Sequence, residues 1–182
     1  SDIPLLQQTA RAWYDHSPLP RQGAAPLLSA RLLALTIQAT LQPFLAIYSQ
    51  ALLPLVNQES WRRAYCPICG DNPDFAYLDK QQGARWLLCS RCDAQWLFQR
   101  LECPYCGTQR QDALSYFTEG DEVYRLYVCE QCHSYLKAID LRRTESEILL
   151  PLERLVTVEL DRHAWRLGYA ASWMSMVPPD RH

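Results

Sequence analysis

Four Cys-x-x-Cys pairs constrain this chain more than any other feature of its sequence. The pairs supply all eight cysteines of the 182-residue chain, and they fall within the segment 66–132. Paired cysteines at this spacing are typical of metal sites, whereas disulfides persist mainly in secreted proteins. The sequence therefore predicts two four-cysteine metal sites. The predicted ligands of the first are Cys66, Cys69, Cys89 and Cys92, and those of the second are Cys103, Cys106, Cys129 and Cys132.

The two sets belong to an internal repeat. The segment 66–70 reads Cys-Pro-Ile-Cys-Gly, and the segment 103–107 reads Cys-Pro-Tyr-Cys-Gly. The gap between the two pairs of a set holds 19 residues in the first set and 22 in the second. β-prone pieces separated by turn residues fill each gap, so each unit is predicted to be a cysteine knuckle, a hairpin and a second knuckle. We therefore expect the ligands to pair within a unit and not across units.

The chemistry of such a unit favours a single metal ion. A Cys-x-x-Cys loop directs two sulfur atoms at one ion, and Gly70 and Gly107 follow their knuckles where a positive φ is often needed. Two loops on one hairpin supply four thiolates in a tetrahedron, which suits zinc with bonds of ~2.3 Å and also a rubredoxin-type iron. The sequence leaves iron and zinc open. A closed four-sulfur site has no free coordination position, so its usual role is to hold the fold together.

Helical patterns flank the cysteine segment on both sides. Leu32, Leu35 and Ala39 recur at helical spacing, and Pro43 should kink or end that helix because it lacks a backbone donor. Residues 146–168 also show a helical pattern. The predicted fold class is α+β, with two tandem rubredoxin-like or zinc-ribbon units flanked by N-terminal and C-terminal helices. The predicted domains are a helical N-terminal region (1–60), a first rubredoxin-like ribbon (61–101), a second rubredoxin-like ribbon (102–145), and a C-terminal helix and tail (146–182).

Charge and composition argue against several classes of function. Lys plus Arg is 18 and Asp plus Glu is 20, so the chain lacks the basic excess of a typical nucleic-acid binder. Polar residues and prolines interrupt the longest apolar stretch, 27–56, which therefore reads as docked helices and not as a membrane span. The opening residues predict no signal peptide. We find no Ser/His/Asp pattern and no phosphate-cradling glycine loop, so we expect a protein that is not an enzyme.

The cysteine segment allows some other interpretations. The segment 103–106 has the residues of a glutaredoxin active site, and 129–133 fits the attachment pattern of c-type haem. Each of these pairs has a matching partner in the repeat, which favours the metal sites. His133 could replace a cysteine as ligand, although a solvated side chain is the simpler expectation. Arg85, Arg91 and Arg100 alternate with acidic residues and are interpreted as solvated faces.

The cysteine repeat and its surroundings resemble the formate dehydrogenase accessory protein (FdhE) family over about residues 61–176. The order and spacing of several motifs carry the resemblance, since one Cys-x-x-Cys pair alone would not be specific. The motifs in question are 66–70 with Pro73, the run Arg-Trp-Leu-Leu-Cys-Ser-Arg-Cys at 85–92, Trp96, Arg100, the pair at 103–106, the pair at 129–132 followed by Ser-Tyr-Leu-Lys at 134–137, and the tail 155–169 with Asp161.

Membership would imply a cytoplasmic maturation factor, or chaperone, that binds the catalytic subunit of respiratory formate dehydrogenase before the twin-arginine pathway exports it. The family's functional cysteines carry over at all eight positions, and its similarity to rubredoxins makes iron a candidate metal. Members usually carry a longer helical region before the first knuckle, so the chain is expected to be a short member or a fragment. We also allow for a homodimer. The alternatives are a rubredoxin-like electron carrier or redox helper, and a zinc-ribbon nucleic-acid adaptor.

Overall fold

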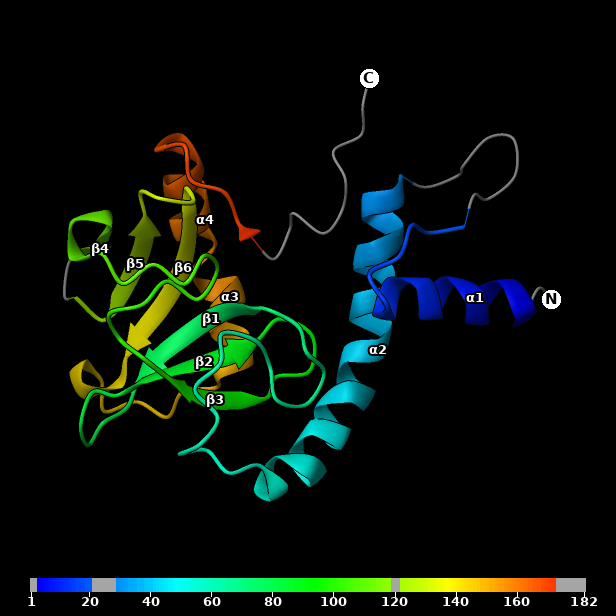
Figure 1. The fold of residues 1–182 in the computed structure, drawn as a ribbon, viewed down its shortest axis with the longest axis horizontal. Coiled ribbons are helices and arrows are strands. Elements are labelled where there is room, and N and C mark those ends of the chain that lie inside the picture. The colour runs from blue at the N-terminus through cyan, green and yellow to red at the C-terminus, as the bar shows by residue number, and fades with distance from the viewer. Residues whose placement is uncertain (1–2, 21–28, 119–121, 173–182) are drawn as a thin grey trace.

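The computed structural model describes residues 3–20, 29–118 and 122–172. In this part of the chain, six strands form one sheet, with α3 and α4 packed against it and α1 and α2 beside it (Figure 1). The predicted α+β fold class is confirmed. The division into four domains stays a prediction.

The strands form two three-stranded antiparallel units that share one sheet. The sheet order is β3-β2-β1-β6-β5-β4. Within each unit the neighbours are antiparallel, and β1 and β6 join the two units as a parallel pair. The cysteine units are thus tandem in sequence but continuous in the sheet. The strand bounds are β1 Pro73–Leu78, β2 Arg85–Cys89, β3 Gln95–Phe98, β4 Leu114–Thr118, β5 Tyr124–Cys129 and β6 Ser134–Asp140.

The N-terminal helices are α1 (Ile3–Tyr14) and α2 (Ala30–Leu52), and the short 3-10 helix η1 (Leu53–Leu55) follows α2 directly. Ser29 caps α2, because its hydroxyl accepts a hydrogen bond from the backbone N–H of Leu32 at 3.2 Å. Pro43 does not end this helix, contrary to one of its two expected effects. Pro43 cannot donate a hydrogen bond to the carbonyl of Ala39, one turn earlier. Both residues are exposed, so that carbonyl faces solvent and the helix can continue.

The C-terminal helical pattern corresponds to two short helices, α3 (Leu150–Val156) and α4 (Val158–Arg166), which meet at Thr157. The Thr157 hydroxyl and backbone N–H both bond to the carbonyl of Glu153. Such competition for one carbonyl favours a break in the helix. The break turns α4, so that Asp161 contacts β6 through an ion pair with Lys137 at 2.7 Å.

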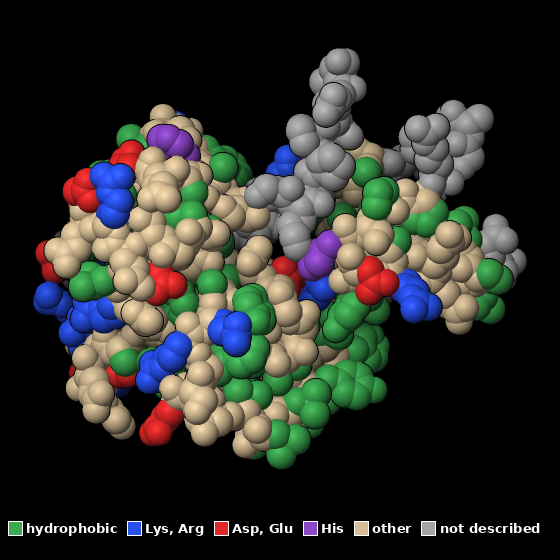
Figure 2. Space-filling view, in the orientation of Figure 1, with side chains coloured by type: hydrophobic (Ala, Val, Ile, Leu, Met, Phe, Trp, Pro, Cys, Tyr) green, Lys and Arg blue, Asp and Glu red, His purple; other side chains and the backbone are tan. Residues whose placement is uncertain are grey.

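An apolar surface covers much of α2. On this helix Phe44, Ile47 and Tyr48 are each more than 60% exposed, and Leu32, Leu35 and Leu52 are 45–49% exposed. Figure 2 shows hydrophobic side chains gathered over this helix. By length and composition alone, the segment Ala30–Leu55 is apolar enough to cross a membrane. Core helices and signal sequences pass the same test, so the expectation that the chain does not insert stays a prediction.

Candidate metal centres

Residues in the left-handed backbone region close all four cysteine knuckles. Gly70 and Gly107 have φ values of 76° and 71°, as the sequence predicts. Asp93 and His133 follow the second pair of each unit at φ values of 56° and 51°. The backbone N–H of each glycine bonds to the carbonyl of the first cysteine of its knuckle, at 3.0 and 2.9 Å. These turns point both sulfur atoms of a knuckle to the same side.

The sulfur atoms of the eight predicted ligands form two groups in the described residues. One contains the cysteines of the first unit and the other those of the second, and within each group the atoms lie within 4.8 Å of one another. Cross-knuckle distances are 3.6 Å for Cys66–Cys92 and 3.4 Å for Cys69–Cys89. The corresponding pairs of the second group, Cys103–Cys132 and Cys106–Cys129, are both separated by 3.7 Å. The grouping follows the units, and ligation by these sulfurs stays a prediction.

The spacing of the sulfur atoms fits a tetrahedral ion. Four sulfurs at ~2.3 Å from one centre would lie ~3.8 Å apart, close to the cross-knuckle distances in both groups. The backbone N–H groups of Ile68 and Arg91 approach the sulfurs of Cys66 and Cys89, each at 3.4 Å. Such N–H groups stabilise thiolate charge. Each group could therefore hold one metal ion, and the soft donor set suits zinc or iron equally.

The close spacing of the thiols favours binding of a metal cation at both cysteine groups. Hydrogen bonds from Cys69 and Cys89 lower the pKa of Cys66, while burial raises the pKa of Cys89. Burial also raises the pKa of Cys103. Four neighbouring thiols cannot all ionise without a compensating positive charge. Metal binding supplies that charge and displaces the protons.

The two groups differ in exposure. Cys66, Cys89 and Cys92 are each no more than 1% exposed in the first group. In the second group Cys106 is exposed and Cys132 is half-buried. Cys69 of the first group is half-buried, so the first centre is the more enclosed of the two, whereas the second has an exposed cysteine.

The second knuckle of the first unit, residues 89–93, holds the N-terminal helices against the sheet. The Gln38 and Gln42 amides on α2 donate hydrogen bonds to the Ser90 carbonyl at 2.9 Å and to the Asp93 carboxylate at 3.1 Å. Two side chains of α2 thus contact this one turn, and α1 contacts it through Arg91. We call residues 89–93 the anchoring knuckle.

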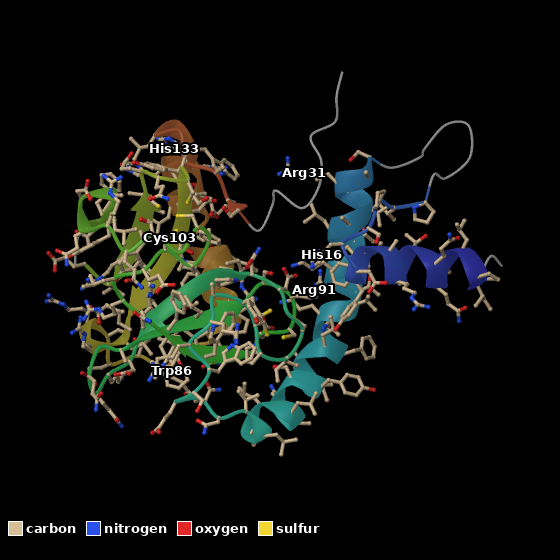
Figure 3. All side chains as sticks on the ribbon, in the orientation of Figure 1. His16, Arg31, Trp86, Arg91, Cys103 and His133 are labelled. Atoms are coloured by element: carbon tan, nitrogen blue, oxygen red, sulfur yellow. The ribbon has the colours of Figure 1, made fainter. Side chains whose placement is uncertain are left out.

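Arg91 attaches α1 to the anchoring knuckle. Its guanidinium lies 4.4 Å from the Trp13 ring centre and pairs with Asp71 at 2.8 Å. It also donates to the Tyr14 carbonyl at 3.0 Å and lies beside His16 (Figure 3). Arg91 is 3% exposed, so the expectation of a solvated face is wrong for this residue. The same correction applies to Arg85, which is also 3% exposed.

Replacing Arg91 with alanine should release α1 from the ribbon. A desolvated cation–π contact alone is worth about 2 kcal/mol, so we expect amide hydrogen exchange in α1 to accelerate by about tenfold or more. Hydrogen exchange read by mass spectrometry on the Ile3–Tyr14 peptide measures this. Arg11→Ala on the same helix is the matched control, because its side chain is 86% exposed and its ion pair with Asp15 is a surface pair. Equal exchange in both variants would contradict the proposed attachment.

His133 contacts the chain after α4 through its backbone carbonyl, and its side chain is not part of either cysteine group. Its carbonyl accepts a hydrogen bond from the Ala170 N–H at 2.7 Å, and its ring lies 6.4 Å from that of Tyr169. The described part of the chain places the other histidines elsewhere: His16 beside Arg91 and His163 against Phe117. The sequence could have suggested this role for His133, since it occupies the position that Asp93 has in the first unit.

Comparison with known proteins agrees with the cysteine pattern. Residues 65–100 match the family model "FdhE, central domain". The protein is 33% identical to an FdhE homologue of Aquifex aeolicus over 146 residues, which are 78% of this chain and 50% of that protein. It is 26% identical to an FdhE homologue of Shewanella oneidensis over 171 residues, covering 92% and 56% of the two chains. The chain thus spans about half the length of these relatives.

The fold also has a counterpart among solved structures. The crystal structure of the FdhE protein from Pseudomonas aeruginosa superposes with a TM-score of 0.65 at 23% sequence identity, covering 94% of this chain and 70% of that one. This similarity supports the fold. The family model, the curated relatives and this structure agree on one family, and together they support the FdhE family for this chain.

Proposed function

We propose that each cysteine group holds one metal ion, iron of the rubredoxin type or zinc, and that the chain is an accessory protein for formate dehydrogenase. Two four-sulfur groups with tetrahedral spacing in a chain of the FdhE family carry the proposal. All eight cysteines would act as ligands. Metal analysis of protein purified without chelator or added zinc should find two equivalents, and an absorbance bleached by reductant would identify iron. Protein that takes up no metal would contradict the proposal.

The client of this protein would be the catalytic subunit of respiratory formate dehydrogenase, bound in the cytoplasm before export. The exposed apolar surface of α2 supports protein binding, since partner surfaces bury apolar and aromatic anchors. No chemical step is assigned to the chain itself. Its contribution would be to hold a binding surface whose shape depends on the metal centres.

A pair of variants tests the proposed binding surface on α2. Ile47, 66% exposed, would be replaced by glutamate, and Gln81→Glu in the exposed turn between β1 and β2 is the matched control with the same introduced charge. A charge in an apolar contact should weaken binding of the purified catalytic subunit by about tenfold or more. The control should change it little. Equal affinity of both variants would exclude this surface, and full formate dehydrogenase activity in cells lacking the protein would exclude the function.

Electron transfer to the client is a second candidate function, favoured by the surface position of Cys106. An iron at the second centre would lie near enough to the surface to exchange electrons with a docked protein. Replacing iron by redox-inert zinc separates the two functions. If the metal only supports the fold, the zinc form should bind and mature the client. If electrons are needed, the zinc form should bind the client without maturing it.

A further inference from the structure

The two metal centres differ in what surrounds them. In the first unit, α1, α2 and α3 all contact the anchoring knuckle, through Arg91, the two glutamines of α2 and Arg154. Arg154 of α3 donates to the Cys89 carbonyl at 2.5 Å. In the second unit, the equivalent knuckle is contacted by the chain after α4, where the Tyr169 hydroxyl bonds to the Glu130 carboxylate. The first centre is therefore enclosed by helices, and the second is not.

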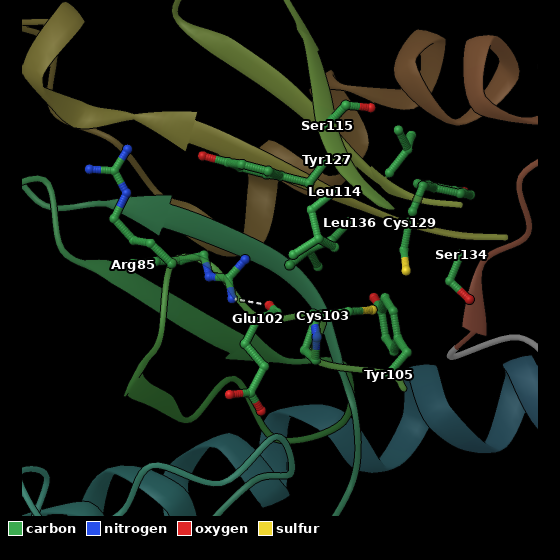
Figure 4. A pocket seen from close by; sticks show the side chains of 14 residues that line it. Arg85, Glu102, Cys103, Tyr105, Leu114, Ser115, Tyr127, Cys129, Ser134 and Leu136 are labelled. Carbon is green, nitrogen blue, oxygen red and sulfur yellow. Dashed lines mark hydrogen bonds between the residues drawn. The ribbon is translucent and has the colours of Figure 1, made fainter. Parts of the chain in front are cut away.

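A cavity of about 30 Å³ leads to the second centre. Cys103 and Cys129 line it together with apolar residues of β4, β5 and β6, and Figure 4 shows both cysteines in its wall. Its volume is enough for a small donor group, since one water needs roughly 10–15 Å³. On the outer side of the same centre, Cys106 is exposed. The centre can thus be approached both at a ligand and through the cavity.

Two arginines in the cavity wall reduce the repulsion that an anionic donor meets at a four-thiolate centre. Arg85 and Arg100 line it, against the single carboxylate of Glu102. That carboxylate accepts a hydrogen bond from the Gln109 amide at 2.8 Å, while Arg85 donates to the Gln99 and Glu102 carbonyls. Arg85 is 3% exposed, and burial lowers its pKa to about 10, so it remains protonated at neutral pH. Two cations beside four sulfurs lower the cost of bringing a further negative donor close.

We propose that the second centre is the exchangeable one: an anionic soft donor, such as a thiolate, enters at the Cys103–Cys129 cavity and displaces a cysteine sulfur from the metal. The inference rests on the proposed metal binding. The leaving sulfur would be that of Cys106, the exposed ligand, which keeps its electron pair and departs as a thiolate or takes a proton from water. The first centre would retain its ion under the same conditions, because three of its cysteines are no more than 1% exposed and the fourth, Cys69, is half-buried.

Competition with a chelator tests the order of exchange. The full chain loaded with two zinc ions would be mixed with excess 2,3-dimercaptopropane-1-sulfonate, a slim anionic chelator whose donors are thiols. The zinc retained after rapid desalting would be measured over time, and samples would be pulsed with iodoacetamide in excess over all thiols for peptide mass spectrometry. We expect one equivalent of zinc to leave about tenfold faster than the other, a barrier difference of about 1.4 kcal/mol. Alkylation should appear first on the cysteines of the second unit. Release of both ions at one rate, or alkylation of the first unit first, would overturn the inference.

A matched pair of arginine variants tests the route. Arg100→Ala removes a cation from the cavity wall, whereas Arg110→Ala removes an exposed cation outside it that pairs with Asp112. The first variant should slow the fast phase by about threefold at low ionic strength, and the second should not. Neutral 1,10-phenanthroline should not distinguish them. Equal rates for both variants with the anionic chelator would overturn the route. Failure of the chain to bind zinc at all is a separate result, which contradicts the proposed function instead.

Discussion

Replacing Cys89 with serine is expected to unfold the first ribbon and to halve the metal content. The Cys89 side chain is fully buried, and its residue opens the anchoring knuckle. Structural zinc contributes about 10–16 kcal/mol in small metal-dependent domains, as much as the whole stability of a typical domain, about 5–15 kcal/mol. The loss should also release α1 and α2 from the sheet. Thermal denaturation together with metal analysis measures both effects.

The neighbouring variant Ser90→Ala is the control for this experiment. Ser90 bonds to Gln38 through its backbone carbonyl, which alanine retains. We therefore expect its melting temperature and metal content to stay close to those of the wild type. If Cys89→Ser also kept both values, a structural metal at the first centre would be ruled out.

The second large effect is expected from Arg154→Leu. The Arg154 guanidinium on α3 is 13% exposed, and it pairs with Asp74 at 2.9 Å and with Asp93 at 2.5 Å, 80 and 61 positions away in sequence. Removing it leaves two largely buried carboxylates, 10% and 19% exposed, without their cation, and breaking a buried ion pair typically costs about 3–5 kcal/mol. Urea denaturation of the metal-loaded protein measures the loss. Arg162→Leu on α4 is the control, because the Arg162 pair with Glu159 is exposed and worth about 0–1 kcal/mol.

The loss of unfolding free energy caused by Arg154→Leu should depend on pH. Burial raises the pKa of Asp74 to about 6 even beside the guanidinium, against 3.8 for a free carboxyl. The folded state thus binds protons more tightly than the unfolded chain, and ionised Asp74 costs stability as the pH rises from about 4 to 6. Without Arg154 the pKa of Asp74 rises further, so ionised Asp74 continues to destabilise the variant above pH 6. The stability loss caused by Arg154→Leu should therefore be larger near pH 8 than near pH 6. An equal deficit at both values would contradict this account of Asp74.

The sequence was sufficient for the features that depend on local spacing. Pairs of cysteines three residues apart, with Gly70 and Gly107 after them, predict the knuckles without any knowledge of distant contacts. The α+β class and the grouping of the cysteines by unit follow from the same repeat. Local turn chemistry determines these features, so a single sequence is enough to predict them.

Features that depend on distant partners could not be predicted in the same way. The strand β6 contains Lys137 and Asp140, which are buried, and polar residues argue against a buried strand in a single sequence. Their charges are balanced by Asp161 on α4 and by Arg125 on β5, at 2.7 and 2.6 Å. Arg91 is a similar case, since its stacking partner Trp13 is distant in sequence. Burying a charged side chain is costly unless an oppositely charged partner lies beside it, and a single sequence does not show which distant residue that partner is.

The parallel pairing of β1 with β6 has a consequence for synthesis on the ribosome. Leu78 pairs opposite Asp140, a residue made about sixty positions later, which takes ~3–12 s at ordinary elongation rates. During that interval the first ribbon can close its own hairpin, while one side of β1 exposes unpaired N–H and C=O groups. Such an open edge is a template for pairing with other nascent chains. Slow translation of the second unit should therefore increase aggregation, more than slow translation of the residues after Asp140.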